Sequence, residues 1–572
     1  MRSMRNRLTK GFSEKVYPNP ADPKVAKKLA AGILEFKQEY LGKEFSWVLG
    51  GRSIFCIAGT NETYETRDPN NPLVMVGYFP KLTPARLEEL ANLHVPAIRA
   101  AGRRFFLETP WPKRVELLRM ISRVARERFW LLCAAKMYET GQSVAEAIGE
   151  TDEEVDFPLA NAMYLEEHNR ELLVASPKFS GDLNGKRYVP HGVFLDVGPF
   201  NFPGAIPMDM ATKALAMGNA VIEKSSPKSS LCGYLVSETI KIAFERMGID
   251  WRGVVNYAPG DVEVVNAFLS HPEIAGVSFT GSSSVLNAIK KQHGDLLRYG
   301  WAGRAKLVTG SAETSGINTF IVCADADPIR AAHEYVKSFV GRSGQKCSSA
   351  RLGFVYEAVY DRFVSEVVKR LDQIRYGDVK EGADLGAMIT AADRDKLAEQ
   401  IKELTAAGIV SMLYEKSIVR GSGHDFPPTV LKFSGLPDGM VRIMNTEFFG
   451  PVSTIVPFRQ MNMVEEMCKL TDFALTGTVF TGDPETLHRI LNFLPAGNVY
   501  WNRKCTGALV ETECFGGLRS SSSPNGIKGR GAMLLFGSQV TFSGFFPEGA
   551  TRKYKQQAQK MFRKIGFDLS KS

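Results

Sequence analysis

One short stretch, Gly344 to Arg351, combines residues that could do covalent chemistry. Cys347 stands there among small residues, with Lys346 before it and Arg351 four positions later. A cysteine attacks as its thiolate, and nearby positive charge favours the thiolate over the thiol. A buried cysteine that packs as a small apolar side chain would fit the same pattern. The stretch alone therefore leaves a catalytic thiol and a core residue both open.

The other cysteines give no sign of a metal site or a disulfide framework. The chain has 8 cysteines, which are scattered and form neither a C-x-x-C pair nor a cluster with histidines. Structural zinc sites and small disulfide-linked domains need such spacing. We therefore expect no metal, and the scattered cysteines favour a reducing compartment.

Length and composition indicate a multidomain globular protein. A chain of 572 residues is too long for one core, and two or three domains are expected. Its 44% hydrophobic and 23% charged residues are ordinary for a soluble protein. The net charge of +9 comes without a sustained Lys/Arg tract, so nucleic acid is not an expected partner. The surplus of positive charge slightly favours anionic ligands such as dinucleotides or carboxylates.

Two features bear on location. No run of 18 apolar residues occurs, so no membrane-spanning helix is expected. The first twelve residues contain four basic residues and no acidic one. They could be a short mitochondrial presequence, but the lack of an apolar face favours a frayed basic tail. We expect a cytoplasmic protein, with the mitochondrial matrix as the alternative.

The middle of the chain alternates strand-like and helix-like segments. Strands are expected at 193–197, 220–224, 254–257, 276–279, 319–323 and 352–356, with helices between them. Such alternation predicts parallel sheets whose ligands bind at the carboxyl ends of the strands. Phe279 to Ser282 marks one strand end, where N–H groups at a helix N-terminus could hold a pyrophosphate or simply begin the helix. Residues about 178–196 are expected to form a β-hairpin, because Asn184-Gly185 is a strong turn signal.

Five motifs in order resemble those of the aldehyde dehydrogenase superfamily. They are Gly198–Pro203, Phe279–Ser282, Glu313–Gly316, the Gly344–Cys347 stretch and Glu447–Val452. The resemblance extends from about Val193 to about Phe545. The segments 497–510 and 515–517 look like the branch that contains Δ1-pyrroline-5-carboxylate dehydrogenases, which oxidise glutamate γ-semialdehyde to glutamate.

The resemblance implies an α/β fold with two parallel-sheet domains and a β-hairpin arm for oligomerisation. The expected domains are a Rossmann-like NAD(P)-binding domain at 1–311, a catalytic domain at 312–497, and a return to the first domain at 498–572. The arm would join a strand near 539–543. A homodimer or higher homo-oligomer is the expected assembly.

The resemblance also implies catalytic roles. Cys347 would be the nucleophile, Asn201 would donate its amide N–H to the oxyanion, and Glu313 would activate the water that releases the product. Oxidation of an aldehyde needs this set, because a thiolate must add before the hydride can leave and the resulting thioester must then be hydrolysed.

NAD is the cofactor implied. The cofactor-binding residues carried over are Lys224, Ser226, Gly281, Ser282, Glu447 and Phe449. NAD-preferring relatives often carry an acidic residue three positions after the lysine, but this chain has Pro227 there. The absence of that carboxylate leaves NADP open.

The substrate residues implied are Phe200, Phe515, Ser521 and Ser523. In the family the loop after Phe-Gly-Gly holds an amino-acid carboxylate through a Ser-Gly pair, but Ser522 replaces that glycine. A different aldehyde or semialdehyde therefore stays open. Two further alternatives are transfer of the acyl group to coenzyme A, and a catalytically silent relative that acts as a binding protein.

Overall fold

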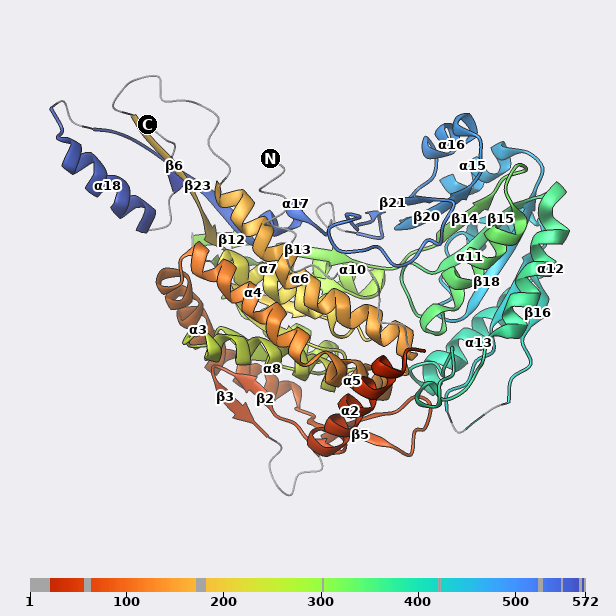
Figure 1. The fold of residues 1–572 in the computed structure, drawn as a ribbon, viewed down its shortest axis with the longest axis horizontal. Coiled ribbons are helices and arrows are strands. Elements are labelled where there is room, and N and C mark those ends of the chain that lie inside the picture. Colours follow the sequence, from red (N-terminus) through yellow and green to blue (C-terminus); the bar gives the residue numbers. More distant parts are fainter. Residues whose placement is uncertain are drawn as a thin grey trace.

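The computed structural model describes residues 21–55, 63–170, 182–300, 303–419, 421, 423–522, 528–546, 549–564 and 568–569. Two lobes lie side by side, and an arm projects from the first lobe (Figure 1). Each lobe is built on one seven-stranded sheet. The expectation of two α/β domains with largely parallel sheets is confirmed.

The sheet of the first lobe has the strand order β13-β10-β7-β8-β9-β2-β3. The five strands from β13 to β9 run parallel, and β2 pairs antiparallel with β9 and β3. Every residue of β7, β8 and β10 is buried, as expected for a sheet that is covered on both faces. The strands are β2 (Trp47–Leu49), β3 (Arg52–Ile54), β7 (Val193–Val197), β8 (Ala220–Lys224), β9 (Val255–Tyr257), β10 (Ile274–Thr280) and β13 (Val308–Glu313).

Helices cover both faces of this sheet. They are α2 (Pro23–Glu39), α3 (Pro84–Glu108), α4 (Trp111–Glu127), α5 (Phe129–Thr140), α6 (Val144–Arg170), α7 (Ala205–Met217), α8 (Ser230–Arg246), α9 (Val262–Ser270) and α10 (Ser283–His293). Smaller sheets are formed by β1 (Lys43–Glu44), β4 (Thr63–Arg67) and β5 (Met75–Pro80), and by β11 (Leu297–Gly300) with β12 (Gly303–Lys306). Gly50 and Gly51, both with positive φ, form the turn that joins β2 to β3.

The sheet of the second lobe has the order β16-β17-β18-β15-β14-β20-β21. All its neighbouring strands run parallel except β16 and β17. The strands are β14 (Asn318–Val322), β15 (Ala350–Tyr356), β16 (Val410–Glu415), β17 (Thr429–Phe433), β18 (Val452–Phe458), β20 (Thr476–Phe480) and β21 (Asn498–Trp501). Because β21 is an edge strand of this sheet, the lobe extends beyond the domain boundary expected at residue 497.

The helices of this lobe are α11 (Pro328–Val340), α12 (Glu357–Gln373), α13 (Ala391–Ala406), α14 (Pro437–Ile443), α15 (Met461–Lys469) and α16 (Pro484–Leu491), with short 3-10 turns η1 (Gly341–Gly344) and η2 (Val379–Glu381). The pair β19 (Phe473–Ala474) and β22 (Leu518–Arg519) connects the lobe to the segment that returns to the first lobe.

The arm differs in detail from the expected hairpin. Its sheet has the order β23-β6-β24, from β6 (Asp182–Pro190), β23 (Gly537–Phe545) and β24 (Asp568–Leu569). Asn184 and Gly185 lie inside β6, where they pair with Ser543 and Phe542 of β23. The turn predicted at Asn184-Gly185 is therefore wrong. Pairing with a distant strand has overridden the local turn preference. The remaining elements near the arm are α17 (Arg530–Met533) and η3 (Leu534–Phe536) before β23, and α18 (Arg552–Lys564) between β23 and β24.

The parallel strands of the first lobe bring several functional candidates to one edge. Lys224 ends β8, Thr280 ends β10, and Glu313 ends β13 directly opposite Thr280. Among the described residues no helix is long and apolar enough to cross a membrane. Nor does the described part of the chain contain three His, Cys, Asp or Glu side chains grouped to hold a metal ion.

Candidate active site

A strained loop holds Cys347 at the start of β15. After α11 ends, Arg342 and Ser343 have φ values of 58° and 51°, and Gly344 follows at 67°. Such left-handed residues persist only where surrounding contacts enforce them. Arg342 donates to Glu150 at 2.8 Å, and the Ser343 hydroxyl donates to the Gly386 carbonyl at 2.8 Å. The loop is therefore fixed from both sides before the chain reaches the cysteine.

Only glycine fits at position 344. A Cβ there would lie 1.8 Å from the carbonyl oxygen of Gly450, in addition to having an unfavourable φ. Arg351 holds the same loop by donating to the carbonyls of Gly344, Lys346 and Gly450 at 2.7, 2.9 and 3.0 Å. Gly344 and Arg351 therefore set the position of Cys347 through the backbone.

Two cavities meet at Cys347. The first cavity, of about 440 Å³, is lined by Lys224, Gly281, Ser282, Glu447 and Phe449 among others. The second cavity, of about 350 Å³, is lined by Glu313, Phe515 and a group of aromatic and acidic side chains. Cys347 is half-buried and lies on the wall of both. The thiol therefore stands where two ligands could approach it from different sides.

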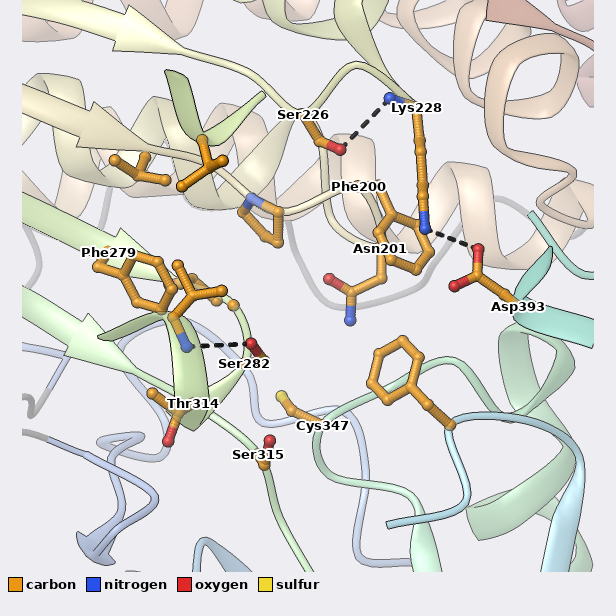
Figure 2. Close-up of a pocket in the computed structure, with 18 of the residues that line it drawn as sticks. Phe200, Asn201, Ser226, Lys228, Phe279, Ser282, Thr314, Ser315, Cys347 and Asp393 are labelled. Atoms are coloured by element: carbon orange, nitrogen blue, oxygen red, sulfur yellow. Dashed lines mark hydrogen bonds and ion pairs between the residues drawn. The ribbon is translucent and has the colours of Figure 1, made fainter. Parts of the chain in front are cut away.

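Asn201 faces the thiol from the loop after β7. Figure 2 shows its amide and the sulfur of Cys347 directed into the same cavity. One amide N–H donates to the carbonyl of Gln345 at 2.9 Å, which orients the side chain. Since an amide group has two N–H donors, the other can serve an oxyanion formed at Cys347. The structure thus brings together two residues that are far apart in the sequence.

Glu313 lies on the other side of Cys347. It is 1% exposed, lines the second cavity, and its Oε1 atom has no hydrogen-bond partner in the described structure. Burial raises the pKa of this carboxyl group, while the positive charge of Lys528 opposes the shift. The Nζ atom of Lys528 is 3.5 Å from Glu313 Oε2. A buried carboxylate with a raised pKa is suited to act as a general base.

The electrostatics of the thiol differ from the expectation. Burial raises the pKa of Cys347 to about 12, with a further contribution from the negative charge of Glu313. Lys528 and Arg351 oppose this shift. Lys346 does not take part, because its ammonium group pairs with Glu146 at 2.6 Å. Of the two cations expected beside the thiol, only Arg351 contributes.

The first cavity contains the residues expected to bind the cofactor. Lys224 is buried, and burial lowers its pKa to about 8. Ser226 lies near it, and its hydroxyl accepts a hydrogen bond from the backbone N–H of Lys228, whose ammonium pairs with Asp393 (Figure 2). Ser282 caps α10 by accepting from the N–H of Val285 at 3.4 Å.

The opposite wall of the first cavity is acidic and aromatic. Glu447 accepts a hydrogen bond from the backbone N–H of Gly316 at 3.0 Å, and burial raises the pKa of its carboxyl group. Phe449 makes an edge contact with Phe200, with ring centres 5.9 Å apart. Phe200 therefore lies in the first cavity and does not line the second, which places it away from Phe515.

These residues fit a dinucleotide. Lys224 and the amino end of α10 supply positive charge and N–H donors for phosphate groups. Glu447 supplies a carboxylate for sugar hydroxyls, and Val262, Val265 and Leu397 give the cavity an apolar surface for a base. The cavity runs from these groups to Cys347, so a bound dinucleotide would have one end at the thiol.

The described part of the loop expected to hold a substrate carboxylate, residues 518–522, lines neither cavity. The Ser521 hydroxyl donates to the carbonyl of Ser315 at 2.7 Å and accepts from the N–H of Ala474 at 2.9 Å. Ser522 donates to the carbonyl of Ala312 at 3.0 Å. The Ser521 side chain is fully buried and lines neither cavity, so the structure gives no support to the expectation that it contacts substrate. Ser523 lies outside the described residues.

Two residues of the second cavity were not foreseen from the sequence. Glu153, on α6, faces the cavity, and burial raises its pKa to about 7. Three consecutive acidic residues at positions 152–154 were a signal for it. Lys528 reaches the cavity from a Gly- and Ser-rich segment, and no local pattern marked it. That both residues share a cavity with Cys347 follows only from the packing of the segments in three dimensions.

Comparisons with known proteins agree with this site. Residues 58–539 match the model of the aldehyde dehydrogenase family. A 1-pyrroline-5-carboxylate dehydrogenase from Geobacillus thermodenitrificans is 29% identical over 530 residues, which cover 90% of this chain and 95% of the relative.

Two solved structures are also similar. A Thermus 1-pyrroline-5-carboxylate dehydrogenase with bound NAD is 28% identical with a TM-score of 0.83, covering 93% of this chain and 98% of that one. Proline utilization A from Bdellovibrio bacteriovorus is 26% identical with a TM-score of 0.84, covering 94% of this chain and 53% of that one. The fold, the nucleophile loop and the family match together define a class: the chain belongs to the aldehyde dehydrogenase family.

Proposed function

We propose that this protein oxidises glutamate γ-semialdehyde to glutamate with NAD as the acceptor. The meeting of two cavities at Cys347 is the observation that carries the proposal. One cavity has the groups that suit a dinucleotide, and the other suits a short aldehyde. The relatives named 1-pyrroline-5-carboxylate dehydrogenase, one of them with bound NAD, support this substrate and cofactor. NADP is the alternative acceptor, and another semialdehyde is the alternative substrate.

In this proposal Cys347 attacks the aldehyde carbon and forms a thiohemiacetal. The second N–H of Asn201 and the backbone N–H of Cys347 hold the oxyanion, and losing one such donor typically costs about 10²–10³ in rate. When bound in the first cavity, the nicotinamide cofactor supplies the hydride acceptor. The thioester that remains on Cys347 is then hydrolysed by water from which Glu313 removes a proton.

The cofactor-binding residues hold the dinucleotide in place and take no part in bond making or breaking. Lys224 and Glu447 would hold the two riboses, Ser226 would assist at the adenosine end, and Gly281 and Ser282 would meet the pyrophosphate. We further propose that the first lobe is the cofactor-binding domain and the second the catalytic domain. The arm formed by β6 and β23 would join copies of the chain in a homo-oligomer. The bacterial origin of the named relatives supports a cytoplasmic location over a mitochondrial one.

The test is oxidation of glutamate γ-semialdehyde by the purified protein, with NAD and NADP compared in parallel. We expect NADH formation by the wild type and none by Cys347→Ala, which should still bind NAD in a direct titration. Turnover by Cys347→Ala would remove Cys347 from its role. Product analysis with and without coenzyme A separates hydrolysis from acyl transfer. If the wild type oxidises no aldehyde in a broad panel, the remaining interpretation is a catalytically silent relative that acts as a binding protein.

A further inference from the structure

Lys528 places a buried positive charge in the second cavity. Its side chain is 14% exposed, and it lines the cavity together with Cys347, Glu313 and Phe515. The Nζ atom lies 5.5 Å from the ring centre of Phe157 and 5.5 Å from that of Phe515. Although burial acts to lower the pKa of Lys528, neighbouring carboxylates raise it, so the group is cationic at neutral pH. The two aromatic rings shield this ammonium from solvent.

The ammonium retains hydrogen-bonding capacity. The one ion pair that it makes within the described part of the chain, with Glu313, has a separation of 3.5 Å, whereas a tight charge-assisted hydrogen bond is about 2.7–2.9 Å. Among the described residues only this long contact with Glu313 uses a donor of Nζ, and a lysine ammonium has three donors. A buried cation with donors to spare favours an anionic ligand, because pairing offsets the loss of hydration.

Three other charged residues of the cavity, Arg530, Glu511 and Glu513, already have partners, and Glu511 accepts a hydrogen bond from the hydroxyl of Tyr164. Arg530 pairs with Glu167 at 3.1 Å. Glu513 accepts from Arg503 at 2.7 Å and from the backbone N–H of Leu509 at 2.6 Å. Lys528 is therefore the cation of this cavity that is best placed to receive a ligand anion.

Glu153 does not oppose such a ligand strongly. Burial raises its pKa to about 7, which favours the protonated form, and the protonated form can donate a hydrogen bond to a carboxylate. Phe202, Ile206 and Val510 line the cavity beside these polar groups. Such a wall suits the methylene chain of a short semialdehyde.

We propose that Lys528 recognises the carboxylate of the aldehyde substrate and so makes the enzyme prefer semialdehydes to neutral aldehydes. It would take the role that Ser521 cannot fill, since that hydroxyl is bound to backbone groups. The inference rests on the proposed oxidation of an aldehyde at Cys347. The sequence predicted that the loop after Phe-Gly-Gly recognises the substrate carboxylate. The proposal assigns this recognition to Lys528, which follows that loop.

The test compares two aldehydes that differ only in the carboxylate, 5-oxopentanoate and pentanal. Lys528→Met removes a charge that lowers the pKa of Glu313 and of Cys347, so kcat/KM should fall for both aldehydes. It should fall about 10- to 100-fold further for 5-oxopentanoate than for pentanal, the effect of losing a hydrogen bond between charged groups. Lys528→Arg should keep most of the preference. The thermal midpoint of Lys528→Met and its affinity for NAD confirm folding.

Two results would overturn the proposal. An equal fall for both aldehydes, with a shifted pH profile, would mean that Lys528 acts through Glu313 or Cys347. The same loss of preference in Arg530→Met would mean that the net charge of the cavity matters and not a contact with Lys528.

A binding measurement keeps the proposal testable apart from turnover. Glutarate, which cannot react, should bind wild type more tightly than Lys528→Met by about 10-fold or more in calorimetry. Equal affinities would contradict the role of Lys528. If wild type binds glutarate as expected but does not oxidise glutamate γ-semialdehyde, the proposed function fails while Lys528 remains an anion-binding residue of the second cavity.

Discussion

Glu150 accepts a hydrogen bond from Arg342 at 2.8 Å in the interior of the protein, where the two side chains are 0% and 3% exposed. The other carboxylate oxygen of Glu150 accepts from the backbone N–H of Gly204 at 2.9 Å. Arg342 belongs to the loop before Cys347, and Gly204 follows the loop that carries Asn201. One buried side chain of α6 therefore connects the two loops that form the proposed oxyanion site.

The first prediction concerns this connection. Glu150→Gln has only one oxygen, so either the guanidinium of Arg342 or the N–H of Gly204 loses its acceptor. We expect the free energy of unfolding to fall by about 3–5 kcal/mol, as for other broken buried ion pairs. Denaturant unfolding measures the loss, and kcat should fall with it because both loops are released.

A control for this prediction is available on the surface. Glu127 pairs with Arg246 at 2.6 Å, but both side chains are more than 40% exposed. Glu127→Gln should cost less than about 1 kcal/mol. If Glu150→Gln were no more damaging than this control, the two loops would not depend on the buried pair.

The second prediction concerns the strained loop. Gly344→Ala should abolish aldehyde oxidation, because its methyl group would overlap the Gly450 carbonyl and displace Cys347. The matched control is Gly248→Ala, where φ is 63° and no atom lies within 4 Å of the added Cβ. This control carries only the cost of the left-handed backbone, about 1–2 kcal/mol. Aldehyde oxidation and the free energy of unfolding are measured for both variants. Equal losses in the two variants would show that the loop around residue 344 can accommodate the methyl group at little cost.

The third prediction concerns the pH dependence of the thiol. A pKa raised to about 12 means that little thiolate exists near neutral pH in the cofactor-free protein. Alkylation of Cys347 by iodoacetamide should therefore rise by about tenfold for each pH unit between neutral pH and pH 10, without a plateau. Mass spectrometry follows Cys347 separately from Cys514, which is exposed. A plateau reached near neutral pH would contradict the raised pKa.

The fourth prediction concerns Glu313. If this residue is the base for hydrolysis, Glu313→Gln should release NADH in a burst equal to the enzyme and then turn over about 10²–10⁴ times more slowly. Rapid-mixing kinetics and intact mass measure the burst and the trapped thioester. Because burial raises the pKa of Glu313, the wild-type hydrolysis step should be lost as pH falls through that raised value. A variant that hydrolyses the thioester at the normal rate would exclude this role.

Much of the architecture follows from local sequence patterns. The alternation of apolar strands and amphipathic helices after Val193 predicted the parallel strands, and β8 begins and ends at the expected residues. The turn at Gly50-Gly51 was also predictable, because both positions need positive φ. Asn184-Gly185 had an equally strong turn signal, but it lies in a strand because β23 pairs with it. The hydrogen bonds between β6 and β23 outweigh the local preference of Asn-Gly for a turn.

The sequence by itself determined the order of the motifs, the family resemblance and the positions of Cys347, Asn201 and Glu313 along the chain. Only the tertiary structure decided which charges surround the thiol and which hydroxyls are available to a substrate. Lys346 is adjacent to Cys347 in sequence but pairs with Glu146, whereas Lys528 comes from a distant segment. Periodicity and turn chemistry act between near neighbours, but electrostatic energy and hydrogen bonding depend on distance in space. That distance is set only when the two lobes and the returning segment pack together.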